Sequence, residues 1–254
     1  MFDEGSGAPV IVIPGVQGRW QWMRPALNAL ATRCRAISYS LRAVEGGADQ
    51  AFEQFVAQVD ETLDARGIRA ATICGISFGG LIALKYAATR PERTKGLILV
   101  STPSPSWTPS PRQAGYMAQP WRSAPAFVIT APARMWPEIA AAIETWPSRV
   151  RFCLEQAARI AAAPAVPSRM AARINLTPGL DLRADCARVT APTLVVTGED
   201  TLDRVVPVES TREYVGLIAG ARYEMMNRTG HVGLVTQPGR FARIVSDFVD
   251  ATNS

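Results

Sequence analysis

Short apolar runs recur along the chain and predict the strands of one sheet. Residues 10–13 read Val-Ile-Val-Ile, an unbroken β-branched run that is typical of a strand covered on both faces of a parallel sheet. Segments of similar strand character return further along the sequence. The predicted strands lie at residues 10–13, 34–41, 71–74, 96–100, 193–197 and 222–225.

Apolar residues at helical spacing lie between these strands. The clearest stripe is Phe52, Phe55, Val56, Val59 and Leu63, and similar stripes predict helices at 20–31, 208–219 and 238–249. A chain that alternates strands with helices folds with right-handed crossovers into a parallel sheet. We therefore expect an α/β fold with a mostly parallel sheet of about six strands and helices on both faces.

The pattern changes after Thr102. Four prolines stand among serines at 103–111, and from there to residue 188 the apolar positions follow helical spacing without a convincing strand. We predict a helical cap at 103–188, inserted between the two parts of a core at 1–102 and 189–254. The cap holds four of the six tryptophans: Trp107, Trp121, Trp136 and Trp146. These side chains are expected either to line an apolar pocket or to hold the cap helices against the sheet.

Composition excludes several classes of function. The net charge is +5, but the arginines are scattered from Arg19 to Arg243, so no nucleic-acid surface is expected. Four widely spaced cysteines and one histidine do not make a zinc site, and we expect neither a metal nor an organic cofactor. Residues 1–7 do not resemble a leader, and no apolar run is long enough to span a bilayer. We therefore expect a soluble, cytoplasmic protein that does not bind membranes.

A tight turn between a strand and a helix contains the best candidate for a nucleophile. The segment Gly75-Ile76-Ser77-Phe78-Gly79 follows the predicted strand at 71–74 and leads directly into an apolar helical pattern. Gly-x-Ser-x-Gly in this setting is typical of a nucleophile elbow, in which small flanking residues let the chain turn sharply and expose the serine oxygen. The alternative is that Ser77 only caps the helix.

A serine nucleophile needs a base and a group that orients it. His231, in a glycine-flanked loop after the last predicted strand, is the only histidine in the chain and thus the only candidate for a base that titrates near neutrality. The loop Gly198-Glu199-Asp200-Thr201-Leu202-Asp203 supplies carboxylates at the end of the preceding strand. The order along the chain is serine, acid, histidine.

With this order of elbow, cap, acid and histidine, the sequence resembles the α/β-hydrolase fold superfamily over nearly its whole length. The resemblance implies a triad of Ser77, Asp203 and His231. The acid is Asp203 when it is counted back from Pro207, whereas a count from Gly198 falls on Thr201, next to Asp200. Asp200 is therefore the alternative acid, or a residue that holds the turn through its side chain.

The same resemblance implies an oxyanion hole made by the backbone N–H groups of Phe78 and Val16. Val16 lies in the loop after the predicted strand at 10–13. Many members begin this loop with His-Gly, whereas this chain has Pro14-Gly15. Gln17 and Trp20 would then lie near the substrate, together with the cap residues Trp107, Trp121 and Trp136, although Trp20 could equally be a core residue of the following helix.

These features predict a serine hydrolase that cleaves small to medium carboxylic esters through an acyl-enzyme, with a small-molecule acyl ester as substrate. The same triad also serves C–C bond and amide hydrolases and acyltransferases. In a C–C bond or amide hydrolase, a cap arginine could pair with a substrate carboxylate or else be a solvated surface charge; the candidates are Arg122, Arg134, Arg149 and Arg151. A slow-turnover binding or receptor-like protein of the same fold is a third interpretation.

Overall fold

The computed structural model describes residues 1–253 and their side chains, except the side chains at positions 124, 127, 128, 132 and 253. Seven strands form one sheet in the order β1-β3-β2-β4-β5-β6-β7, in which β1 is antiparallel to β3 and every other pair is parallel. The strands are β1 (Phe2–Glu4), β2 (Pro9–Ile13), β3 (Arg35–Ser38), β4 (Ala71–Ile76), β5 (Thr94–Val100), β6 (Thr193–Thr197) and β7 (Arg222–Met225). The predicted α/β class with a mostly parallel sheet is confirmed.

The sheet has one strand more than the six predicted from the sequence. β1 has only three residues, of which Phe2 alone is buried, so it carries too little apolar pattern to be recognised. Its polar residue Asp3 forms ion pairs with Arg35 and Arg66 instead. The edge strand β1 therefore depends on its contacts in the folded chain, not on a local sequence pattern.

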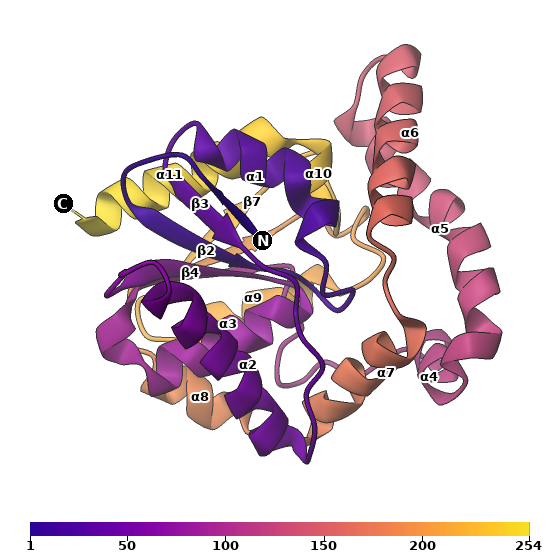
Figure 1. Cartoon of the computed structure of the whole chain (residues 1–254). Helices are drawn as coiled ribbons and strands as arrows, with labels where there is room; N and C mark the ends of the chain where they lie inside the picture. The colour runs from indigo at the N-terminus through magenta and orange to yellow at the C-terminus, as the bar shows by residue number, and fades with distance from the viewer. Residues whose placement is uncertain (254) are drawn as a thin grey trace.

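Helices cover both faces of the sheet, and alternate strand residues face them (Figure 1). On one face, Val10 and Val12 of β2 belong to the same cluster as buried residues of α1 and α11; on the other, Ile11 and Ile13 pack with α2 and α3. The core helices are η1 (Trp20–Met23), α1 (Arg24–Ala31), α2 (Ala48–Asp64), α3 (Phe78–Thr89), η2 (Pro91–Arg93), α9 (Val208–Leu217), α10 (Gly233–Thr236) and α11 (Pro238–Asn253).

The segment between β5 and β6 is helical, as predicted. It contains α4 (Pro111–Ala118), α5 (Pro120–Ala142), α6 (Trp146–Ala162), α7 (Pro167–Leu176), η3 (Thr177–Gly179) and α8 (Leu182–Arg188). Helices α4 to α7 lie together at one side of the sheet (Figure 1). In contrast, α8 packs against α3 in the core through Leu182 and Cys186. The boundaries of the cap at 103 and 188 stay a prediction.

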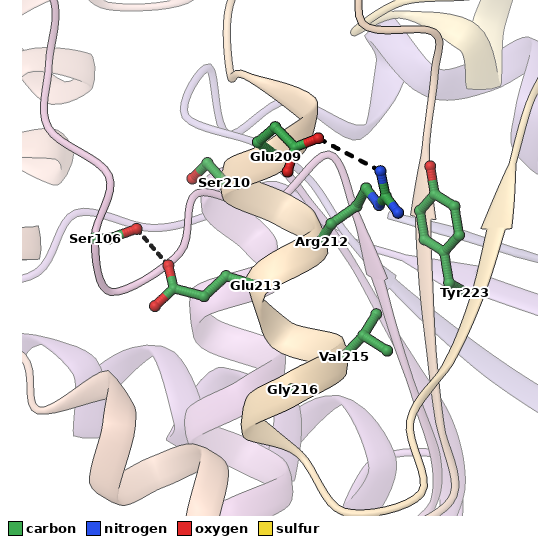
Figure 2. Close-up of a pocket in the computed structure, with 8 residues that line it drawn as sticks. All are labelled: Ser106, Glu209, Ser210, Arg212, Glu213, Val215, Gly216 and Tyr223. Carbon is green, nitrogen blue, oxygen red and sulfur yellow. Dashed lines mark hydrogen bonds and ion pairs between the residues drawn. The ribbon is translucent and has the colours of Figure 1, made fainter.

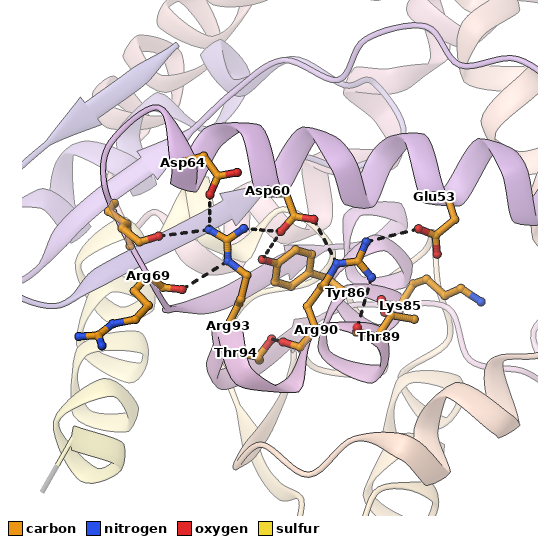
Figure 3. A network of polar contacts seen from close by, with 11 residues as sticks. Glu53, Asp60, Asp64, Arg69, Lys85, Tyr86, Thr89, Arg90, Arg93 and Thr94 are labelled. Atoms are coloured by element: carbon orange, nitrogen blue, oxygen red, sulfur yellow. Dashed lines mark hydrogen bonds and ion pairs between the residues drawn. The ribbon is translucent and has the colours of Figure 1, made fainter.

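Two sets of contacts fix α3, the helix that begins beside Ser77. At its start, the ring of Phe78 packs against Phe52 and Phe55 of α2, with centroids 5.7 and 5.8 Å apart. At its far end, Asp60 of α2 accepts hydrogen bonds from the Tyr86 hydroxyl and from Arg90 and Arg93, at 2.9, 3.1 and 2.8 Å (Figure 3). The elbow is thus attached to a helix that is held at both ends.

None of the helices within residues 1–253 combines the length and the hydrophobicity that a membrane crossing requires.

Candidate active site

Ser77 occupies the turn between β4 and α3 with a backbone that few non-glycine residues adopt. Its φ is +53° and its ψ is −121°, a strained conformation for a residue with a Cβ. The N–H of Ser77 donates to the carbonyl oxygen of Val100 on the neighbouring strand β5, at 2.8 Å. The side-chain oxygen forms no hydrogen bond within the described chain, and the residue is partly exposed. The hydroxyl is therefore available to a substrate, and backbone strain of this kind is characteristic of functional sites.

The glycines around Ser77 let the loop after β2 lie directly on the elbow. A Cβ at Gly79 would stand only 2.6 Å from the carbonyl oxygen of Pro14, and a Cβ at Gly15 would stand 3.4 Å from the Cβ of Ser77. Phe78 begins α3, so its N–H belongs to the first helical turn and has no acceptor inside the helix. The loop that contains Val16 therefore packs closely against the elbow that contains Phe78. That their N–H groups form an oxyanion hole stays a prediction.

His231 and Asp203 form a buried pair. Nδ1 of His231 lies 3.2 Å from Oδ2 of Asp203, and the side chains are 13% and 1% exposed. The other carboxylate oxygen, Oδ1, accepts hydrogen bonds from the N–H groups of Val205 and Val206, at 3.0 and 3.1 Å. Both carboxylate oxygens therefore have hydrogen-bond partners. A neutral imidazole that donates to this carboxylate carries its proton on Nδ1, which leaves Nε2 able to accept one. Asp200 is exposed and does not share these contacts.

The charges of this pair reinforce one another. Burial lowers the pKa of His231, but the charge and the hydrogen bond of Asp203 and the charge of Glu138 outweigh it, so the pKa lies above its ordinary value. Burial raises the pKa of Asp203, but His231 and the two N–H groups outweigh that effect and hold it below its ordinary value. The pair therefore favours the imidazolium form, which a general base must become when it takes a proton.

The parallel strands explain how these residues meet. Ser77, Asp203 and His231 follow β4, β6 and β7, and Val16 follows β2, so all four stand beyond the carboxyl ends of parallel strands. Ligands of open α/β sheets bind at this edge. A sequence model of the alpha/beta hydrolase family matches residues 10–244.

The chain belongs to the alpha/beta hydrolase family. The resemblance stated from the sequence is thereby confirmed.

Curated relatives of this hydrolase family differ in their named substrates. A protein of Stutzerimonas stutzeri (strain A1501) that bears the provisional name carbamate hydrolase RutD is 27% identical, over 94% of this chain and 91% of that protein. The 2-hydroxymuconate semialdehyde hydrolase of Pseudomonas putida is also 27% identical, over 98% of this chain and 89% of its own. At this distance the family is shared, and the substrate is not settled.

Solved structures show the same fold. The enol-lactonase of Burkholderia xenovorans LB400 superimposes with a TM-score of 0.74 at 24% identity, covering 98% of this chain and 95% of its own. The esterase EaEST of Exiguobacterium antarcticum gives a TM-score of 0.76 at 21% identity and covers 100% of this chain and 94% of its own. These similarities concern the architecture of the hydrolase alone.

The tryptophans predicted to bind substrate lie in different surroundings. Trp20 packs against Phe2 at the edge of the core, with ring centroids 5.7 Å apart. Trp107 is half-buried, whereas Trp121 is 64% exposed. Trp136 is 38% exposed, and its ring meets that of Trp146 at a centroid distance of 5.5 Å. None of these tryptophans lines either of the two hollows reported below, and their contact with substrate stays a prediction.

A hollow of about 640 Å³ lies along α9, apart from the predicted site (Figure 2). Its lining residues are Ser106, Glu209, Ser210, Arg212, Glu213, Val215, Gly216 and Tyr223. The carboxylate of Glu213 is already paired with Arg183 and accepts a hydrogen bond from Ser104 at 2.7 Å. Since this hollow contains no unpaired carboxylate and no predicted site residue, its size alone does not make it the active site.

Two cap residues that no sequence motif marks reach the site. Arg173 of α7 is 4% exposed and donates to the carbonyl oxygens of Val16 and Leu41, at 2.7 and 3.1 Å. Glu138 of α5 is 1% exposed and contacts the loop that carries His231. Neither residue belongs to a recognisable motif of its helix, so only its burial in the folded chain identifies it. Within the described residues, no group of three or more histidines, cysteines or acids could hold a metal ion.

Proposed function

We propose that this hydrolase cleaves small to medium carboxylic esters with Ser77 as nucleophile, His231 as general base and Asp203 as the group that orients the base. The observation that carries the proposal is the buried Nδ1–Oδ2 contact of 3.2 Å between His231 and Asp203, at the sheet edge where the strained elbow presents Ser77. A histidine held in this way and a serine lifted out of a sheet suit acyl transfer.

The first step forms an acyl-enzyme. Nε2 of His231 takes the hydroxyl proton as Ser77 Oγ bonds to the carbonyl carbon, and the N–H groups of Val16 and Phe78 stabilise the oxyanion. The imidazolium then gives its proton to the alcohol oxygen, the C–O bond breaks and the alcohol leaves. We expect the hydrogen bond between Ser77 and His231 to form in the complex with substrate, because catalytic hydrogen bonds often reach their full geometry only there.

The second step regenerates the enzyme. His231 takes a proton from water as the water oxygen bonds to the acyl carbon, and the proton returns to Ser77 when the ester bond breaks. The carboxylic acid is then released. Asp203 stays ionised throughout, because its pKa is held below the ordinary value by its partners.

A fluorophosphonate probe tests this proposal directly. We expect Ser77 Oγ to displace fluoride and form a stable phosphonate ester, which peptide mass spectrometry locates on Ser77. The Ser77→Ala variant serves as the matched control and is expected to remain unlabelled. A wild-type protein that forms no adduct would favour the binding-protein interpretation over a serine hydrolase.

A second candidate function is hydrolysis of a substrate that carries a carboxylate. Arg19, Arg169 and Arg173 line a small hollow with Gln17, whose space of about 10 Å³ suits one water-sized oxygen. Among the described residues, none of these arginines forms an ion pair with a carboxylate. Burial lowers the pKa of Arg173 to about 10, and the charges of Arg169 and Arg19 act in the same direction. An anion would offset this repulsion.

This candidate is supported by one relative, whose named substrate, the semialdehyde of a dicarboxylic acid, keeps one carboxylate. The test compares kcat/KM for two p-nitrophenyl esters of similar shape, the negatively charged hemisuccinate and the uncharged 4-methylpentanoate. We expect the ratio of the first value to the second to fall about tenfold in Arg169→Ala, because the variant loses a charge that binds the carboxylate. Arg151→Ala, at an arginine that is 82% exposed on the cap helix α6, is the control and should keep the ratio. An equal ratio in both variants would exclude the arginine cluster as a carboxylate site.

A further inference from the structure

The loop that carries His231 is held by the cap helix α5 on both sides of the histidine. We define this histidine loop as residues 226–232, between β7 and α10. After His231, the N–H of Val232 donates to both carboxylate oxygens of Glu138, at 3.1 and 3.2 Å. Before it, Arg228 donates through Nε to the carbonyl oxygen of Ala141 at 2.7 Å and pairs with Glu144 at 3.0 Å. The C-terminal end of α5 and the residues just after it thus hold the histidine loop on both sides of His231.

Glu138 is an unusual residue for such a contact. Its side chain is 1% exposed, and no lysine or arginine among the described residues pairs with it. A buried carboxylate without a cation is costly unless hydrogen bonds or a nearby positive charge compensate it. The hydrogen bonds come from the histidine loop itself, and the positive charge that acts on Glu138 is that of the protonated imidazole of His231.

The electrostatic contacts link three titratable groups from three elements. The charges acting on His231 are Asp203, from the loop after β6, and Glu138, from α5. Those acting on Glu138 are His231 and Asp203. Arg228, the nearest cation of the histidine loop, is engaged by Glu144 and Ala141 instead.

We propose that Glu138 is a positioning residue of the active site, which holds the histidine loop through its backbone and presents a second negative charge to the imidazole of His231. The inference rests on the proposed role of His231 as general base. The cap helix α5 would thereby take part in the chemistry as well as in covering the substrate. When Ser77 gives up its proton, the negative charges of Asp203 and Glu138 both stabilise the imidazolium that forms.

The electrostatics agree in direction with this geometry. Burial raises the pKa of Glu138 and Asp203 adds to the rise, whereas the backbone hydrogen bonds at Gly230 and Val232 and the charge of His231 oppose it. Glu138 also helps to keep the pKa of His231 above its ordinary value. Removing the charge of Glu138 must therefore lower the pKa of His231 and make the neutral base available at lower pH.

The test uses the single histidine of the chain. NMR titration of the imidazole carbon-bound protons, in protein made without a histidine tag, reports the pKa of His231 without any need for assignment. In Glu138→Gln the amide oxygen can still accept the N–H of Val232 while the charge is lost, and we expect the pKa of His231 to fall by about one unit. The acid limb of kcat/KM should move to lower pH by the same amount.

Two further variants make the result decisive. Glu144→Gln removes an exposed carboxylate from the segment just after α5 and should leave the imidazole titration at its wild-type position. Glu138→Met, which removes the charge with a side chain of similar volume, should reproduce the fall and provides a second route if Glu138→Gln does not fold. An unchanged titration in either Glu138 variant would show that Glu138 only holds the loop and would overturn the inference.

Failure of the proposed function would look different. The NMR titration does not depend on turnover, so it reports on Glu138 even if no ester is cleaved. Ester hydrolysis that persists in Ser77→Ala would refute the serine mechanism, whereas a wild-type imidazole titration in Glu138→Gln would refute the role of Glu138 alone.

Discussion

Replacing Ser77 with alanine is expected to lower kcat for a p-nitrophenyl ester by about 10⁵-fold, with little change in KM. Alanine removes the attacking oxygen and keeps the oxyanion hole and the substrate contacts, so ground-state binding is retained while the acyl-enzyme cannot form. Alanine also keeps a Cβ at the φ of +53°, so the strain at the elbow and the folding of the chain should be unaffected.

The measurement needs a control variant at another serine and a preparation free of host esterases. Ser106→Ala changes a serine that lines the hollow along α9, outside the proposed triad and oxyanion hole, and should retain wild-type kinetics. Both variants should be purified from a host strain in parallel with wild type, because traces of host esterase would set the lower limit of detection. Full activity in Ser77→Ala would show that the hydrolysis does not use the elbow serine.

Asparagine at position 203 is expected to lower kcat by about 10³- to 10⁴-fold, whereas asparagine at position 200 should leave it within about twofold of wild type. Oδ2 of Asp203 lies 3.2 Å from Nδ1 of His231, while Asp200 is exposed and outside this contact. Without the carboxylate, the imidazole loses the charge that stabilises its protonated form and the acceptor that sets its tautomer.

The two asparagine variants should be compared in parallel, over a pH range that includes the acid limb. In Asp203→Asn the pKa of His231 should fall, because the largest contribution that raises it has been removed. The Asp200→Asn profile should follow that of wild type. A greater loss at position 200 than at position 203 would reverse the assignment of the acid.

The choice between Asp203 and Asp200 shows what residue spacing alone cannot predict. Counts from Gly198 and from Pro207 disagree by two residues, so the sequence favoured Asp203 without excluding Asp200. The structure adds a distance and a burial: the loop turns so that Asp203 accepts two backbone N–H groups and faces His231. The conformation of the turn determines which of the two acids points inward, and the spacing of residues along the sequence does not predict that conformation.

The cap is a second case in which the sequence predicts the elements but not their contacts. Its helices follow from apolar spacing, and its place between β5 and β6 follows from the change in composition after Thr102. The tryptophans of the cap were predicted either to line an apolar pocket or to hold the cap helices against the sheet. In the structure, Trp121 is mostly exposed and Trp136 packs on Trp146. Apolar character predicts that a side chain avoids water, but it does not say which neighbour it meets.

By itself, the sequence determined the α/β class, six of the seven strands, the helical insertion and the elbow around Ser77, because these depend on local periodicity and on glycines at a sharp turn. It also singled out His231, as the only histidine. The tertiary structure alone decided the edge strand β1, the contact between Asp203 and His231, and the burial of Arg173 and Glu138 against loops more than ninety residues away in sequence. Contacts of that kind join elements that share no local pattern, so they exist only once the chain has folded.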